Sequence, residues 1–233
     1  MIKAVLFGSL GSMTDLTDLE RQAFNRAFAD HGLALRWSRD QYHAAIRRYG
    51  RFSGLDSLIP RLGQCDPATV YSDVEMHFRD LIDETEITPD PWFVEAAAML
   101  QRKAVKLALV TGASRQTTLR VLASLFPSCA SRVFDIITAA EDDAGQKPSP
   151  HIYRFALDEL HVGAKNAIAL ETTRDGLRAA KAAGLYTISL PTGVVAPSEL
   201  TQADDQRARK LDLNISEFHF RQFQYRPQAS ARV

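Results

Sequence analysis

Five short apolar segments alternate with helical segments along this chain, and this alternation constrains its fold more than any other feature. The segments are nearly uninterrupted apolar runs at positions 2–7, 106–110, 134–138, 167–170 and 186–190. Such runs are typical of strands that are buried on both faces of a parallel sheet. Because segments with helical periodicity follow them, we predict an α/β fold built on a doubly wound parallel sheet with right-handed crossovers.

The stretch after the first apolar segment contains only helical signals. Apolar residues recur at helical spacing up to Gly32, which we expect to end the first helix. Ser38 and Gln41 have the spacing of a capping box, and Asp66 followed by proline has the pattern of a helix start. We therefore expect residues 15–86 to form a helical cap inserted into the sheet domain.

This reading divides the rest of the chain into two further parts. Residues 1–14 and 87–215 are expected to form the core domain, and residues 216–233 a carboxyl-terminal tail that carries aromatic and basic residues. Chain ends are often poorly ordered, so we expect a partly ordered tail. Packing of the tail on the core and self-association are the alternatives.

The composition excludes several classes of partner and site. Lys and Arg total 28, as do Asp and Glu, so the formal net charge is zero and gives no reason to expect nucleic acid or an anionic membrane. No apolar run approaches the roughly 20 residues of a membrane-spanning helix, and the amino terminus has no secretory pattern. We therefore expect a cytoplasmic protein. Cys65 and Cys129 lack the spacing of a zinc site, and we expect no disulfide.

The glycine-rich turn from Gly8 to Ser12 is the first candidate site. Ligands of open α/β sheets bind outside the carboxyl ends of the strands, and the loop amides from Ser9 to Gly11 are potential donors to an anion. The two serine hydroxyls are poor nucleophiles here. Strand alternation turns Ser9 to the other side, and Ser12 has no nearby histidine in the sequence to act as a base.

Four segments resemble the motifs of the haloacid dehalogenase-like (HAD) hydrolases. The stretch MIKAVLFGSLGSMTD is similar to the first motif: Gly11, Met13 and Asp15 fit, whereas Gly8 and Leu10 stand at the two aspartate positions. LALVTGAS resembles the second motif, GQKPSP the third and ALETTRDG the fourth. Within the family the likeness is to the CbbY-like sugar-phosphate phosphatases, near the phosphoglycolate phosphatase and β-phosphoglucomutase group. It implies a Rossmann-like core, a helical cap and, in the family, a magnesium ion.

The resemblance also implies which chemistry this chain has lost. In the family, one aspartate forms an aspartyl-phosphate, the second transfers protons, and an acidic pair in the fourth motif helps to bind magnesium. Gly8 and Leu10 carry no carboxylate, and Thr172 replaces one member of the acidic pair. Glu171 is left as a weak remnant of the metal site. We therefore expect no catalytic residue and no metal cofactor.

The phosphate-binding part of the family pattern is better preserved. Hydroxyl, amide and ammonium groups could still hold an anion. The residues expected to bind substrate are Ser9, Thr111, Gly112, Ala113, Lys147 and Arg51. Arg51 belongs to the loop 49–53, which corresponds to the substrate-contacting cap loop of the CbbY-like group.

Three functions are compatible with this sequence. The first is a non-catalytic family member that binds phosphate or a phosphorylated metabolite, a protein partner or a second copy of itself. The second is an active, magnesium-dependent phosphatase of small phosphorylated metabolites with an altered mechanism. The third is a structural or interaction protein without a ligand pocket, which a site plugged by Leu10 would favour.

Overall fold

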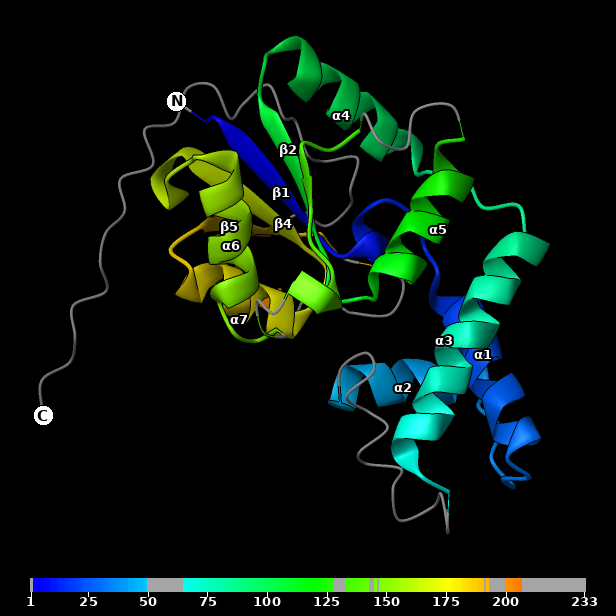
Figure 1. The fold of residues 1–233 in the computed structure, drawn as a ribbon. Coiled ribbons are helices and arrows are strands. Elements are labelled where there is room, and N and C mark those ends of the chain that lie inside the picture. Colours follow the sequence, from blue (N-terminus) through cyan, green and yellow to red (C-terminus); the bar gives the residue numbers. More distant parts are fainter. Residues whose placement is uncertain are drawn as a thin grey trace, which may run out of the picture.

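A six-stranded parallel sheet forms the centre of the molecule (Figure 1). The computed structural model describes residues 2–49, 65–127, 133–142, 145, 147–190, 192 and 200–206. The strand order is β3-β2-β1-β4-β5-β6, and every neighbouring pair is parallel. The strands are β1 (Ala4–Gly8), β2 (Lys106–Val110), β3 (Ile136–Ile137), β4 (Ala167–Glu171), β5 (Tyr186–Ser189) and β6 (Asp205–Gln206). The predicted fold class is confirmed.

The two edges of the sheet differ from the expected pattern. Strand β3 is only two residues long, although the apolar run was expected to pair over five. Strand β6 was not predicted, because its sequence is polar and short. It is held beside β5 by the Asp204 carboxylate, which accepts hydrogen bonds from the amide and the hydroxyl of Thr187, both at 2.8 Å.

Helices cover both faces of the sheet and divide the core into two clusters. They are α4 (Pro91–Arg102), α5 (Arg115–Leu125), α6 (His151–Leu160) and α7 (Arg174–Ala182). Val5 and Phe7 of β1 belong to the larger cluster, with α4 and α5, whereas Ala4 and Leu6 belong to the smaller cluster, with α6. Alternate side chains of β1 thus enter opposite layers, which explains why the strand sequence is apolar at every position.

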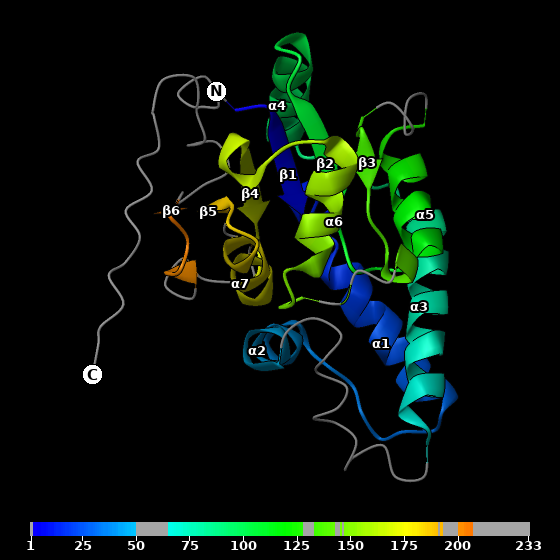
Figure 2. The same cartoon turned by 60° about the vertical axis from the view of Figure 1, so that its left-hand side comes forward.

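All regular structure in the described part of residues 15–86 is helical, as expected. The helices are α1 (Thr17–Asp30), α2 (Arg39–Tyr49) and α3 (Pro67–Glu84). The Ser38 amide donates to the Gln41 side chain at 2.9 Å and the Gln41 amide to the Ser38 hydroxyl at 3.3 Å, which confirms the capping box. Asp66 caps α3 through the Thr69 amide. Figures 1 and 2 show these three helices gathered on the side toward which the strands point.

Several predictions from the sequence are tested only in part by the structure. The division into core, cap and tail stays a prediction, and the tail, Cys129 and Arg51 lie outside the described residues. Cys65 is a free thiol. Among the helices of the described ranges, none combines the length and the apolar character that crossing a bilayer requires.

Replacing Phe7 by alanine should test the packing of the central strand. The ring is fully buried and makes edge contacts with the rings of Trp92, Phe93 and Phe134. We expect Phe7→Ala to lower the free energy of unfolding by about 3–5 kcal/mol, because it leaves a cavity in the core. The measurement is urea denaturation followed by circular dichroism.

The control for that experiment is Leu119→Ala on α5. Leu119 is 53% exposed, so its truncation should change the free energy of unfolding by no more than about 0.5 kcal/mol. Equal losses in the two variants would contradict the assignment of Phe7 to the core.

Candidate functional site

The candidate site lies where the three central strands end. Gly8, the last residue of β1, pairs in register with Val110 at the end of β2 and with Glu171 at the end of β4. The loops that follow β1 and β2 carry Ser9, Thr111, Gly112 and Ala113, and Lys147 lies in the segment between β3 and α6. The tertiary structure therefore brings together strand ends that lie 102 residues (Gly8 and Val110) and 163 residues (Gly8 and Glu171) apart in the chain.

The chain turns sharply after Gly8 and buries Leu10. Ser9 has a positive φ of 99°, and the turn is closed by the amide and hydroxyl of Ser12, which both donate to the Ser9 carbonyl at 3.1 and 2.7 Å. The Leu10 side chain is only 6% exposed and belongs to the larger core cluster. The position that holds a proton-transferring carboxylate in the family is thus an apolar core residue here.

Glu171 is the centre of the polar network at the strand ends. Its side chain is fully buried. Oε1 accepts hydrogen bonds from the Lys147 ammonium at 2.6 Å and from the Tyr153 hydroxyl. Oε2 accepts from the Thr172 amide at 3.1 Å and from the Thr173 hydroxyl at 3.5 Å. The carboxylate is therefore surrounded by donors on both oxygens.

Two glycines provide the space that this carboxylate occupies. A Cβ atom added to Gly8 would lie 2.2 Å from Glu171 Oε1 and 2.5 Å from the Tyr153 hydroxyl. A Cβ atom added to Gly176 would lie 2.0 Å from Glu171 Oε2. The Glu171 carboxylate thus fills the room beside Gly8, where a nucleophile side chain would have to begin.

Lys147 is turned inward and is held by three contacts. Its ammonium donates to the Val110 carbonyl at 3.1 Å as well as to Glu171, and it lies 5.2 Å from the centre of the Tyr153 ring. The side chain is 13% exposed. Burial, followed by the negative charge of Glu171, raises the pKa of Tyr153 well above its usual range, so the phenol stays protonated and donates to the carboxylate.

Several groups expected to bind an anion already have partners. The Ala113 amide donates to the Thr111 hydroxyl at 3.1 Å, and the Ser9 amide donates to the Val110 carbonyl at 3.0 Å. The Ser9 and Thr172 hydroxyls are hydrogen bonded to each other at 3.0 Å. Among the described residues the Gly112 amide has no such partner. An anion at this site would use Lys147, Thr111 and that amide first, with the other two amides changing partner.

The residues at the strand ends do not fit a magnesium ion. In the described ranges no group of three or more His, Cys, Asp or Glu side chains could hold a metal. Both Glu171 oxygens are already hydrogen bonded, and the positive charge of the Lys147 ammonium beside them would repel a metal ion. Asp15 is exposed and accepts a hydrogen bond from the Thr17 amide.

Sequence reasoning missed two members of this site, Tyr153 and Gly176. Tyr153 lies on the buried face of α6, and its one distinguishing feature in the sequence is a hydroxyl among apolar residues at helical spacing. Gly176 belonged to the quoted fourth-motif segment, but nothing in the sequence showed that its missing side chain leaves room for a carboxylate.

Comparison with known proteins shows the family to which this chain belongs. A family described as haloacid dehalogenase-like hydrolase matches residues 2–184. The chain belongs to the haloacid dehalogenase-like hydrolases. It is 34% identical to protein CbbY of Cereibacter sphaeroides, over 88% of this chain and 90% of the relative. A phosphorylated carbohydrates phosphatase of Thermotoga maritima is 26% identical over 80% of this chain and 84% of its own length.

Solved structures give the same assignment. The structure of CbbY from Rhodobacter sphaeroides in complex with phosphate has a TM-score of 0.82 and 32% identity, covering 92% of this chain and 97% of that protein. A variant of the same CbbY, solved with xylulose-(1,5)bisphosphate, matches equally well. These HAD relatives confirm the predicted resemblance to the CbbY-like group of sugar-phosphate phosphatases.

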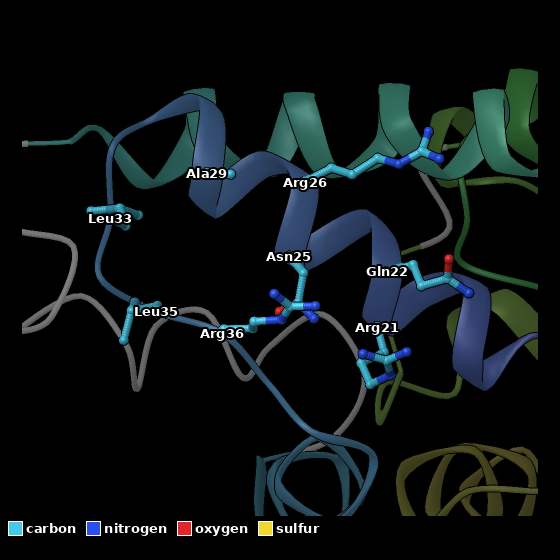
Figure 3. A pocket seen from close by; sticks show the side chains of 8 residues that line it. All are labelled: Arg21, Gln22, Asn25, Arg26, Ala29, Leu33, Leu35 and Arg36. Carbon is cyan, nitrogen blue, oxygen red and sulfur yellow. The ribbon is translucent and has the colours of Figure 1, made fainter.

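A separate cavity of about 450 Å³ lies beside α1 (Figure 3). It is lined by Arg21, Gln22, Asn25, Arg26, Ala29, Leu33, Leu35 and Arg36, from α1 and the segment that follows it. Two of its three guanidinium groups are paired: Arg21 with Asp18 at 3.0 Å and Arg26 with Glu84 at 2.8 Å. None of the strand-end residues lines this cavity.

Two arginines pair with Asp18, and this should make the stability of the protein sensitive to acid. Hydrogen bonds from Arg21 and then Arg39 lower the pKa of Asp18 from 3.8 to about 2. A lowered folded-state pKa stabilises the protein above the unfolded value, and this contribution is lost as the pH falls from about 4 to about 2. We expect Asp18→Asn to be less stable than the native protein at pH 6, with the difference shrinking toward pH 2.

Urea denaturation at a series of pH values measures this difference. Asp158→Asn is the control, because Asp158 is exposed and its carboxylate has no partner in the ranges that the structure covers. A destabilisation by Asp18→Asn that is constant with pH would contradict the assignment.

A methyl group at position 8 should be destabilising because of Glu171. The Gly8→Ala Cβ would collide with the carboxylate and the Tyr153 hydroxyl, and we expect a loss of about 1–3 kcal/mol in the free energy of unfolding. In a Glu171→Ala background the same change should cost less, with a coupling of about 0.5–3 kcal/mol between the two positions.

Gly163→Ala is the matched control for the glycine substitution. A Cβ atom there meets no heavy atom within 4 Å, and its φ of −70° suits alanine. Its effect should stay within about 1 kcal/mol. Full additivity of the changes at positions 8 and 171 would show that the two do not compete for the same space.

Proposed function

We propose that this chain is a non-catalytic member of the CbbY-like HAD group that binds phosphate or a small phosphorylated metabolite without magnesium. The observation that carries this proposal is the position of Glu171. Its carboxylate fills the space beside Gly8, where the family nucleophile would begin, and it is tied to Lys147 and Tyr153. A non-catalytic role follows because the remaining groups cannot supply the missing steps.

Phosphoryl transfer through a covalent intermediate needs an accessible nucleophile and a group that moves protons. Glu171 has no exposed surface and is held by four donors. Leu10 offers no proton. In the part of the chain that the structure describes, neither the Ser9 nor the Ser12 hydroxyl is hydrogen bonded to a histidine or a carboxylate that would take its proton.

Two observations support a phosphorylated ligand: the position of the Lys147 ammonium and the ligands found in structures of CbbY. The Lys147 ammonium donates to the Val110 carbonyl at the end of β2, and Thr111 and Gly112 follow Val110 in the chain. Ammonium, hydroxyl and backbone amide groups are the kinds of donor that bind phosphate oxygens. CbbY from Rhodobacter sphaeroides has been solved with phosphate and with xylulose-(1,5)bisphosphate. We extend that ligand class to this chain. A protein partner, self-association and a cytoplasmic location stay predictions.

A turnover assay tests the loss of catalysis. We expect the purified protein to release no more phosphate from an aryl phosphate or a panel of sugar phosphates than the blank does, with or without magnesium. Lys147→Met is the control for contaminating phosphatase. Magnesium-stimulated turnover that disappears in Lys147→Met would contradict the proposal and support an active phosphatase with an altered mechanism.

Calorimetric titration with inorganic phosphate tests the binding role. Because the donor set does not fit a metal, the dissociation constant should be the same with magnesium and with chelator. Lys147→Met should weaken binding by roughly tenfold or more, as expected when a charge-assisted contact worth about 1.5–3 kcal/mol is lost. Absence of binding by the native protein would leave a structural or interaction role in its place.

A further inference from the structure

The groups around Glu171 are those of an anion-binding site, and the anion that they bind here is the carboxylate of Glu171 itself. An ammonium, a phenol, a backbone amide and a hydroxyl converge on the two carboxylate oxygens. These are the donor types that hold a phosphate group. The carboxylate and its lysine are both largely buried, at 0% and 13% exposure, so neither is satisfied by bulk water.

We propose that the Glu171 carboxylate is a built-in competitor that occupies Lys147 and must move away before phosphate can bind. The inference rests on the proposed function, because it concerns the regulation of that same site. It reverses the role implied by the family resemblance, where this position helps to bind the metal. Here the side chain closes the site against external anions.

The glycine at position 8 explains why the competitor fits. With any larger residue there, a Cβ atom would stand 2.2 Å from Glu171 Oε1 and 2.3 Å from its Cδ, and the carboxylate could not take this position. Gly176 leaves the matching space on the other side, at 2.0 Å from Oε2. Loss of the side chain at position 8 and the inward position of Glu171 are therefore one coupled change.

Competition from within the chain predicts weak binding by the native protein. When a ligand binds only a minor state, its apparent dissociation constant is the intrinsic one divided by the fraction of molecules in that state. A state populated at about 1% therefore weakens binding about 100-fold. Removing the carboxylate removes this penalty and leaves Lys147 without its anion. We expect Glu171→Ala to bind inorganic phosphate at least about tenfold more tightly than the native protein.

The experiment is calorimetric titration of the full chain with inorganic phosphate in the presence of chelator, together with the phosphate-induced shift in melting temperature. Glu171→Gln is a second variant in case Glu171→Ala does not fold, because glutamine removes the negative charge but keeps the shape of the side chain. Adding Lys147→Met to either variant should abolish the gain. A merely structural role for Glu171 would lower stability without raising affinity for phosphate.

Asp204→Asn is the matched control. It also removes one negative charge and leaves a lysine, Lys181, without the carboxylate that now lies 2.8 Å away. It should not change phosphate affinity, because it lies on the β5–β6 edge rather than at the ends of β1 and β4. A gain in this variant equal to that of Glu171→Ala would overturn the inference by showing a general effect of charge.

The remaining outcomes separate the inference from the proposed function. Equal phosphate affinity in the native protein and both Glu171 variants overturns the inference and leaves the proposed function in place. Binding by the Glu171 variants alone supports the inference and overturns the proposed role of the native protein. Absence of binding in all three overturns both.

Discussion

The buried contact between Glu171 and Lys147 is the interaction on which the centre of this structure depends. A carboxylate without solvent exposure is tolerated in a protein only when it is paired and hydrogen bonded. Here the 2.6 Å contact to the ammonium is completed by donors from Tyr153 and from the start of the α7 segment. Lys147 extends the network to the Val110 carbonyl. One ionic contact thus connects the ends of β2 and β4 with α6.

This arrangement gives a physical account of how a HAD scaffold persists without its aspartates. A buried ammonium at the strand ends needs a negative partner, because an unpaired charge in the interior is strongly destabilising. In this chain Glu171 provides that charge from within the fold, and the absence of a side chain at Gly8 gives it the necessary room. The scaffold thus keeps its lysine although the first-motif positions carry no carboxylate, because the charge of Lys147 is balanced from within the fold.

Helix α3 is connected to the same region through hydrogen bonds rather than through the cavity. The Ser114 hydroxyl donates to the Glu75 carboxylate of α3 at 2.8 Å, and Ser114 also caps α5 through the Thr117 amide. Because Ser114 ends the loop that begins at Thr111, this hydrogen bond joins α3 to the loop that follows β2. The arginine-lined cavity of Figure 3 belongs to α1 and the segment after it and takes no part in this connection.

The sequence by itself determined the architecture and which motif positions lack a carboxylate. Apolar runs, capping residues and motif spacing predicted the parallel sheet, the helices and the absence of carboxylates at Gly8 and Leu10, because these depend on local periodicity and residue identity. The two-residue strand β6 escaped prediction because it is held by the side chain of Asp204 rather than by an apolar run. Only the tertiary structure decided where Glu171 points and that Tyr153 meets it. Those contacts join residues from separate elements, and a linear pattern carries no information about the space that a missing side chain leaves in the folded protein.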